Sequence, residues 1–185
     1  MKHLKMLGLL AVAAAAFMAF AGNAYAAPVL THPAGTAYTG SLEASLTGSA
    51  KLEAGIEDTC SSGSVGGTVE TNTETSASGK ISSLAFGNCS TTTTVIEPVV
   101  GTLSINDSGE VTAKGANVTV SQFGISCVYG AGEGTLLGTL TPGEPAVLNV
   151  LTTELPKQSG GLFCASEGTW EAQYTVTNPS SLFLN

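Results

Sequence analysis

Strict alternation of apolar and polar residues is the feature that most constrains how this chain can fold. Within Trp170–Thr177, the residues Trp170, Ala172, Tyr174 and Val176 share one parity, and polar residues occupy the other. A period of two is the signature of a β-strand with one buried face. The same alternation recurs in a second segment, at Phe123, Ile125, Cys127 and Tyr129. We therefore expect both segments to be strands whose apolar side chains point into a core.

Turn signals separate further alternating segments, and no segment after residue 26 keeps a helical period over three turns. Asn106–Gly109 and Thr141–Pro145 are the clearest turns, because Asn, Asp, Gly and Pro favour the backbone conformations that turns need. Short strands with turns every ~8–12 residues are typical of an all-β sandwich or barrel. We expect a single antiparallel β-sandwich with Ig-like or Greek-key-like connectivity.

The N-terminal half gives more local predictions. Tyr38–Leu46 and Ala50–Glu57 both alternate, which predicts two strands joined as a hairpin near Thr47–Ser49. Cys60–Gly67 is rich in Gly and Ser, which indicates a loop. Thr68–Ser78 is polar on both faces, so it is interpreted as an exposed edge strand or a loop.

The first 26 residues have the pattern of a secretory signal peptide. Lys2 and Lys5 precede an Ala-rich apolar run, and Ala24–Ala26 forms an A-x-A cleavage site. An uncleaved membrane anchor is disfavoured because the run is shorter than the ~20 residues that a spanning helix needs. We expect a signal peptide at 1–26 and one β-sandwich domain at 27–185, with Ala27–Gly35 as an exposed lead-in. This predicts a secreted protein, in the periplasm, at the cell surface or outside.

Charge excludes some partners. Loss of Lys2 and Lys5 would leave four lysines, no arginine and fourteen acidic residues, a net charge of −10. Nucleic-acid binding needs clustered Lys and Arg, so nucleic acid is not an expected partner. An anionic membrane surface would also repel the chain. After cleavage the sequence contains no second apolar run long enough to be an integral membrane segment.

Four cysteines in an exported chain predict two disulfides. Three pairings are possible, and we favour Cys60–Cys89 and Cys127–Cys164 because each joins neighbours in the sequence. These bonds would close loops of roughly 30 and 40 residues and stabilise the fold by about 3.5–4 kcal/mol each. A zinc site is the alternative, but the C-x(2–4)-C pairs that it usually needs are absent from the sequence.

Residues for catalysis are scarce. His32 is the only histidine after the signal peptide, and neither G-x-S-x-G nor S-x-x-K occurs. Pairs of glutamates could act in glycoside hydrolysis, but most fall on outward strand positions or in turns. We therefore expect no catalytic, cofactor-binding or metal site. Trp170 and Tyr174 could stack on sugars, although their shared parity with Ala172 favours core packing, with Trp170 near the Cys127–Cys164 bond.

The C-terminal half also carries a recognisable pattern of residues. A C-x-Y-G strand is followed by a G-T-L strand, an S-G-G-x-x-C element and a T-W-x-A-x-Y-x-V strand. The residues that carry it are Cys127, Tyr129, Gly130, Pro145, Ala146, Ser159, Gly160, Gly161, Cys164, Trp170 and Tyr174. The pattern resembles a group of small exported bacterial proteins of actinobacterial type. The resemblance implies export, a β-sandwich and disulfides, and it implies no activity.

These observations favour a non-enzymatic structural, adhesive or binding module at the cell surface or outside. Its partner is not specified by the sequence and could be a cell-surface polymer or a protein. The loops Cys60–Gly67 and Gly130–Gly134 are the expected contact regions, because binding residues concentrate on loops. Two alternatives stay open. One is a carboxylate-pair enzyme on extracellular polysaccharide, and the other is a carrier with an apolar pocket of a few hundred Å³.

Overall fold

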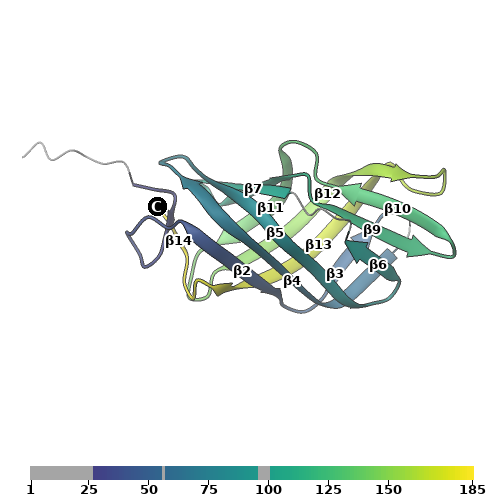
Figure 1. Cartoon of the computed structure of the whole chain (residues 1–185), viewed down its shortest axis with the longest axis horizontal. Helices are drawn as coiled ribbons and strands as arrows, with labels where there is room; N and C mark the ends of the chain where they lie inside the picture. Colours follow the sequence, from purple (N-terminus) through teal and green to yellow (C-terminus); the bar gives the residue numbers. More distant parts are fainter. Residues whose placement is uncertain (1–26, 56, 96–100) are drawn as a thin grey trace, which may run out of the picture.

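A computed structural model describes residues 27–55, 57–95 and 101–185, so the predicted signal peptide lies outside the described residues. The described chain forms an elongated molecule of β-strands and connecting loops (Figure 1). In chain order the strands are β1 (Leu30–Thr31), β2 (Gly40–Leu46), β3 (Ala50–Glu53), β4 (Glu57–Asn72), β5 (Ser76–Cys89), β6 (Thr92–Val95), β7 (Gly101–Asn106), β8 (Glu110–Lys114), β9 (Asn117–Gln122), β10 (Ile125–Gly130), β11 (Thr135–Thr141), β12 (Val147–Gly160), β13 (Glu167–Asn178) and β14 (Phe183–Leu184).

Most of the strands form a continuous antiparallel ladder that closes on itself. The pairings run β2–β4–β5–β7–β8–β11–β12–β13 and return to β2, because β2 pairs with both β4 and β13. Opposite sides of this circuit are antiparallel and pack face to face around an apolar core. The predicted all-β sandwich is therefore confirmed. Each strand of the circuit pairs with the next circuit strand along the chain. The connectivity is therefore an up-and-down meander, and the predicted Ig-like or Greek-key order is wrong.

The predicted hairpin between β2 and β3 is also wrong. Both segments pair with the same two neighbours, β4 on one side and β13 on the other. They are thus two parts of one strand position, interrupted at Thr47–Ser49, where Gly48 has a φ of +79°. An alternating pattern on both sides of a short turn-like segment cannot distinguish an interrupted strand from a reversal of chain direction.

The Gly/Ser-rich stretch Cys60–Gly67 lies inside the long strand β4 and is not a loop. Its glycines allow close approach of the neighbouring strand: a Cβ on Gly67 would lie 2.3 Å from the carbonyl oxygen of Lys80. Thr68–Ser78 is the end of the β4–β5 hairpin, and its exposed residues Thr73–Thr75 form the predicted loop. Thr68 and Val69 pair also with β2, and Ser76–Ser78 pair also with β7, so these parts are not edge strands. Glycine marks a tight sheet contact here and not a change of chain direction.

The chain ends close one end of the molecule. β1 pairs with β14, and Val29, Leu30 and Leu182 are all 0 % exposed. The side chain of Asn72 anchors this cap, because its Oδ1 accepts from Leu30 N at 3.1 Å and its Nδ2 donates to Leu30 O at 2.6 Å. The lead-in Ala27–Gly35 was predicted to be exposed, and for Val29–Thr31 this prediction is wrong.

The two alternating strands that define the sequence pattern are present. In β13, Ala172, Tyr174 and Val176 are buried, and Trp170 is half-buried against the same core. In β10, Cys127 and Tyr129 are buried in a second cluster of core residues. The turns predicted at Asn106–Gly109 and Thr141–Pro145 also connect consecutive strands as expected.

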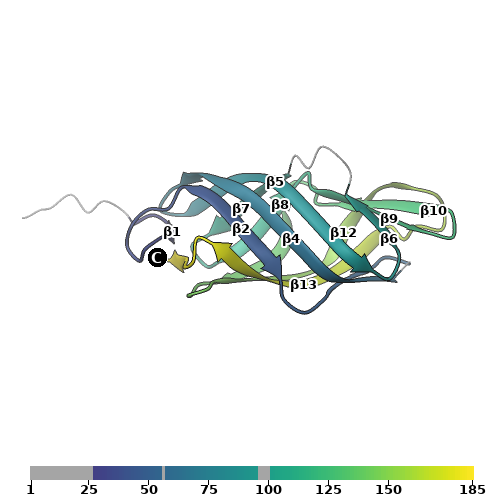
Figure 2. The ribbon, with the colours of Figure 1, turned by 60° about the horizontal axis from the view of Figure 1, so that its bottom comes forward.

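A small sheet extends the molecule at the end opposite the cap. β10 pairs with the C-terminal part of β12, β9 pairs with β10, and β6 forms the outer edge. Figures 1 and 2 show this extension and the C-terminus at opposite ends of the long axis. The connections that leave β9 and β12 at this end are therefore remote from the cap.

Candidate interaction surface

The β9–β10 hairpin ends in a tight turn that places an aromatic side chain in solvent. Gln122 and Ile125 are cross-strand partners, so Phe123 and Gly124 are the two turn residues. Both have positive φ, +51° and +79°. This combination is that of a type I′ turn, whose central positions favour Asn and Gly. Phe123 is 94 % exposed, so its predicted inward position in a strand is wrong.

The connection between β12 and β13 exposes two more large apolar side chains. Leu162 is 102 % exposed and Phe163 is 78 % exposed. The next residue, Cys164, is buried and forms a disulfide with Cys127 of β10. Lys157 Nζ also donates to the Cys164 carbonyl oxygen at 3.1 Å. The connection is therefore fixed to the body of the protein directly behind the exposed pair.

Both connections lie at the same end of the molecule. Cys127 is the cross-strand partner of Gly160, which places the hairpin strand β10 beside the strand that leads to Leu162. Figure 2, turned from the first view, again shows the β9–β10 hairpin at the end farthest from the C-terminus. We call the side chains of Phe123, Leu162 and Phe163 the apolar tip. Large apolar side chains that are exposed at one end of a molecule are a feature of interaction sites.

The two chain segments that carry the apolar tip contain no charged residue. Between Lys114 and Glu133 no residue is charged, and the same holds between Lys157 and Glu167. The full chain has a formal net charge of −8. The acidic residues thus lie outside both segments that carry the tip. Charge depletion together with exposed aromatics is the composition found at the centre of protein interfaces and at membrane-contacting surfaces.

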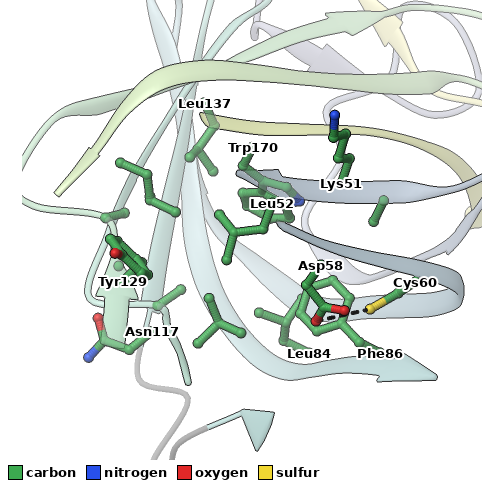
Figure 3. Close-up of a pocket in the computed structure, with 16 residues that line it drawn as sticks. Lys51, Leu52, Asp58, Cys60, Leu84, Phe86, Asn117, Tyr129, Leu137 and Trp170 are labelled. Atoms are coloured by element: carbon green, nitrogen blue, oxygen red, sulfur yellow. Dashed lines mark hydrogen bonds between the residues drawn. The ribbon is translucent and has the colours of Figure 1, made fainter. Parts of the chain in front are cut away.

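A partly open cavity lies between the small sheet and the main circuit. Its volume is about 50 Å³, and apolar side chains line most of it, among them Leu52, Leu137 and Trp170 (Figure 3). The rings of Trp170 and Phe86 meet edge to face, with centroids 6.3 Å apart. The carrier alternative predicts an apolar pocket of a few hundred Å³, and this cavity is much smaller. A hollow of about 390 Å³ does exist, but it is open and has mixed polar and apolar lining around Thr47 and Gln173.

Two polar side chains at this cavity serve the structure. Asp58 is 3 % exposed, and its Oδ1 accepts from Thr91 N at 2.9 Å and from Ser90 Oγ at 3.1 Å. Asp58 thereby holds the start of β6 against β4. Tyr129 Oη lies 2.9 Å from the carbonyl oxygen of Ala54. Burial raises the pKa of Tyr129, and its Oη also lies 3.1 Å from the carbonyl oxygen of Ala165.

The four predicted disulfide residues pair as expected. Cys60 bonds to Cys89 across β4 and β5, and Cys127 bonds to Cys164. Asp58 lies close to the first pair, but both sulfurs are consumed in the disulfide and are not thiolate ligands. These two disulfides fit an oxidising extracellular or periplasmic location.

Every glutamate side chain that the structure describes is exposed. The carboxylate-pair alternative requires an acid whose pKa is raised by burial, and the glutamates in the described ranges offer no such environment. Glu97 lies outside the described residues.

His32, the one histidine among the described residues, contacts Ser181. Its Nδ1 lies 2.7 Å from the carbonyl oxygen of Ser181 and 2.9 Å from Ser181 Oγ. Because a carbonyl oxygen only accepts, this nitrogen carries the proton and cannot also take the serine proton as a base. The contact between His32 and Ser181 therefore joins the two chain ends that form the cap.

Of the two contact regions predicted from the sequence, Cys60–Gly67 lies in β4 and not in a loop, with Ser61, Ser62 and Ser64 exposed. In Gly130–Gly134 the first two residues are buried, whereas Glu133 and Gly134 are exposed. A contact role for either region stays a prediction. The apolar tip was missed. Its signals are an X-Gly dipeptide at Phe123–Gly124 between two alternating runs, and an apolar pair directly after the Gly160–Gly161 dipeptide.

Comparison with protein-family models, with curated protein sequences and with solved structures finds no match for this chain. The resemblance to small exported bacterial proteins therefore stays a prediction. Among residues 27–55, 57–95 and 101–185, no helix has the length and hydropathy needed to cross a membrane.

Proposed function

We propose that this chain is an exported, non-enzymatic binding module that contacts another surface through its apolar tip. The observation that carries the proposal is the exposure of Phe123, Leu162 and Phe163 at the end opposite the cap. Solvent exposure of three large apolar side chains contributes nothing to folding, whereas their burial against a partner would be favourable. The two disulfides and the predicted signal peptide support a site of action outside the cytoplasm.

The position of the tip suits a binding module. Both ends of the described chain lie together at the cap, where Asn185 N donates to Val29 O at 3.1 Å. The tip is at the other end of the long axis and is free of the chain termini. The disulfide Cys127–Cys164 fixes the two tip segments to one another, which lowers the conformational entropy lost on contact.

The test is co-sedimentation of the purified, disulfide-bonded protein with the isolated envelope of a producing bacterium. Wild-type protein is expected in the pellet, and a Phe123→Asn, Leu162→Ser, Phe163→Ser triple variant is expected in the supernatant. The matched control is Leu151→Ser, because Leu151 is 63 % exposed on β12 and does not belong to the tip. Equal sedimentation of the triple variant and the wild type would refute the proposal.

A further inference from the structure

The size of the apolar tip limits what can bind it. An aromatic side chain buries roughly 150–250 Å², so the three large side chains of the tip offer at most roughly 450–750 Å². A stable protein–protein interface needs about 800 Å² from each partner. The tip consists of side chains on two narrow connections, with no adjoining exposed apolar face among the described residues. A second copy of the chain or a folded protein partner would therefore bury too little surface on the tip alone.

Narrow apolar projections instead suit a soft, deformable phase. A lipid surface closes around each inserted side chain and needs no shape complementarity. The turn residues keep polar backbone groups, which cannot enter the hydrocarbon core without hydrogen-bond partners. Insertion is therefore shallow, at the boundary between headgroups and acyl chains, where aromatic side chains are favoured.

The charge distribution selects the type of lipid. The tip segments 115–132 and 158–166 contain no charged residue, and the neighbouring cation, Lys157, donates to the Cys164 carbonyl oxygen at 3.1 Å. The remainder of the chain is acidic, and an anionic surface would repel it. An electrically neutral surface is approached without this repulsion.

Phe123 provides an independent observation. Its φ of +51° is unfavourable for a bulky residue, and its side chain is 94 % exposed. Phe123 therefore has a backbone conformation that is unfavourable for its residue type, and its side chain does not contribute to the core. Strained residues of this kind concentrate at functional sites.

We infer that the apolar tip inserts into the interfacial region of an electrically neutral lipid surface, an inference that rests on the tip being the contact site as proposed above. Phe123 enters from the β9–β10 turn, and Leu162 and Phe163 enter from the β12–β13 connection. The Cys127–Cys164 disulfide holds both in position for simultaneous insertion.

The test is flotation of the disulfide-bonded protein with phosphatidylcholine vesicles, and separately with vesicles that contain added phosphatidylglycerol. We expect wild-type protein to float with the neutral vesicles, independently of salt, and to float less with the anionic ones. Each single substitution, Phe123→Asn, Leu162→Ser or Phe163→Ser, is expected to lower the partition coefficient about tenfold. Leu151→Ser is expected to leave it unchanged.

The vesicles contain no protein or polymer, so this test separates the inference from the proposed function. If wild-type protein does not float but its envelope sedimentation depends on the tip, the lipid inference is wrong and the contact is a protein or polymer. Flotation only with anionic vesicles, lost at high salt, would also overturn the inference. Flotation of the triple variant at the wild-type level would show that the tip is not the lipid contact.

Discussion

Replacing Phe123 with asparagine is expected to make the protein more stable, although it removes one of its larger apolar side chains. Phe123 and Gly124 are the central residues of a type I′ turn, with φ of +51° and +79°. Asparagine and glycine are the residues that this turn prefers. The Phe123 side chain is 94 % exposed, so the substitution removes almost no buried apolar area.

The magnitude follows from these two facts. A bulky residue held in the left-handed region costs about 1–3 kcal/mol, and asparagine relieves part of this cost because its side chain tolerates that conformation. With no burial lost, the free energy of unfolding should rise by about 1 kcal/mol. For a slope of about 2 kcal/mol per M of urea, the midpoint of unfolding should shift upward by about 0.5 M.

The assay is equilibrium urea unfolding of the disulfide-bonded protein, followed by the fluorescence of Trp170. The matched control is Leu162→Asn, which removes a tip residue of 102 % exposure that has no positive φ. The control should leave the midpoint unchanged, whereas both variants should weaken vesicle binding. A Phe123→Asn midpoint equal to or below that of the wild type would refute the reasoning from turn conformation.

Four further predictions concern the interior. Tyr174 Oη is buried and has no hydrogen-bond partner among the described residues, so Tyr174→Phe should raise the free energy of unfolding by about 1 kcal/mol in urea titrations. Burial raises the pKa of Tyr174 above its ordinary 10.0, so the unfolded chain loses this proton first and stability falls above about pH 10. Thermal unfolding from pH 9 to 11 should show a smaller fall for Tyr174→Phe, and an equal fall in both proteins would contradict this assignment. The double variant Cys127→Ala, Cys164→Ala opens a loop of sequence separation 37 and should lose about 4 kcal/mol, measured by urea unfolding against the wild type, with an unchanged midpoint as the contrary result. Asp58→Ala leaves the Thr91 N–H without its acceptor and should cost about 2–3 kcal/mol, and a loss below 0.5 kcal/mol would show that Asp58 does not hold β6.

The sequence was sufficient to predict those parts of the fold that depend on local periodicity. The alternation in Trp170–Thr177 corresponds to β13, with Ala172 and Tyr174 buried as predicted. The turn Asn106–Gly109 also follows from local chemistry, since Asn106 Oδ1 accepts from Glu110 N at 2.8 Å. In each case the interacting groups are close in sequence, and the pattern therefore contains the information.

The predictions that failed depend on contacts between distant segments. Whether β2 and β3 form a hairpin or one interrupted strand is decided by β4 and β13, which pair with both. Whether Gly67 marks a loop or a close strand contact is decided by Lys80 in the neighbouring strand. Meander and Greek-key connectivities likewise share the same strands and differ only in which of them pair.

The apolar tip illustrates a different limit, because there the local pattern was read correctly as alternation and still gave the wrong position. Phe123 continues the parity of Cys127 and Tyr129, yet the turn begins one residue after Gln122 and removes Phe123 from the strand. Parity places a side chain on a face only while the chain remains extended. At the end of a hairpin the same apolar residue faces solvent and does not contribute to the core. The circuit strands are paired along both edges, and the cap covers the end opposite the apolar tip. At the tip, an exposed aromatic side chain, a strained turn and an uncharged stretch of sequence coincide.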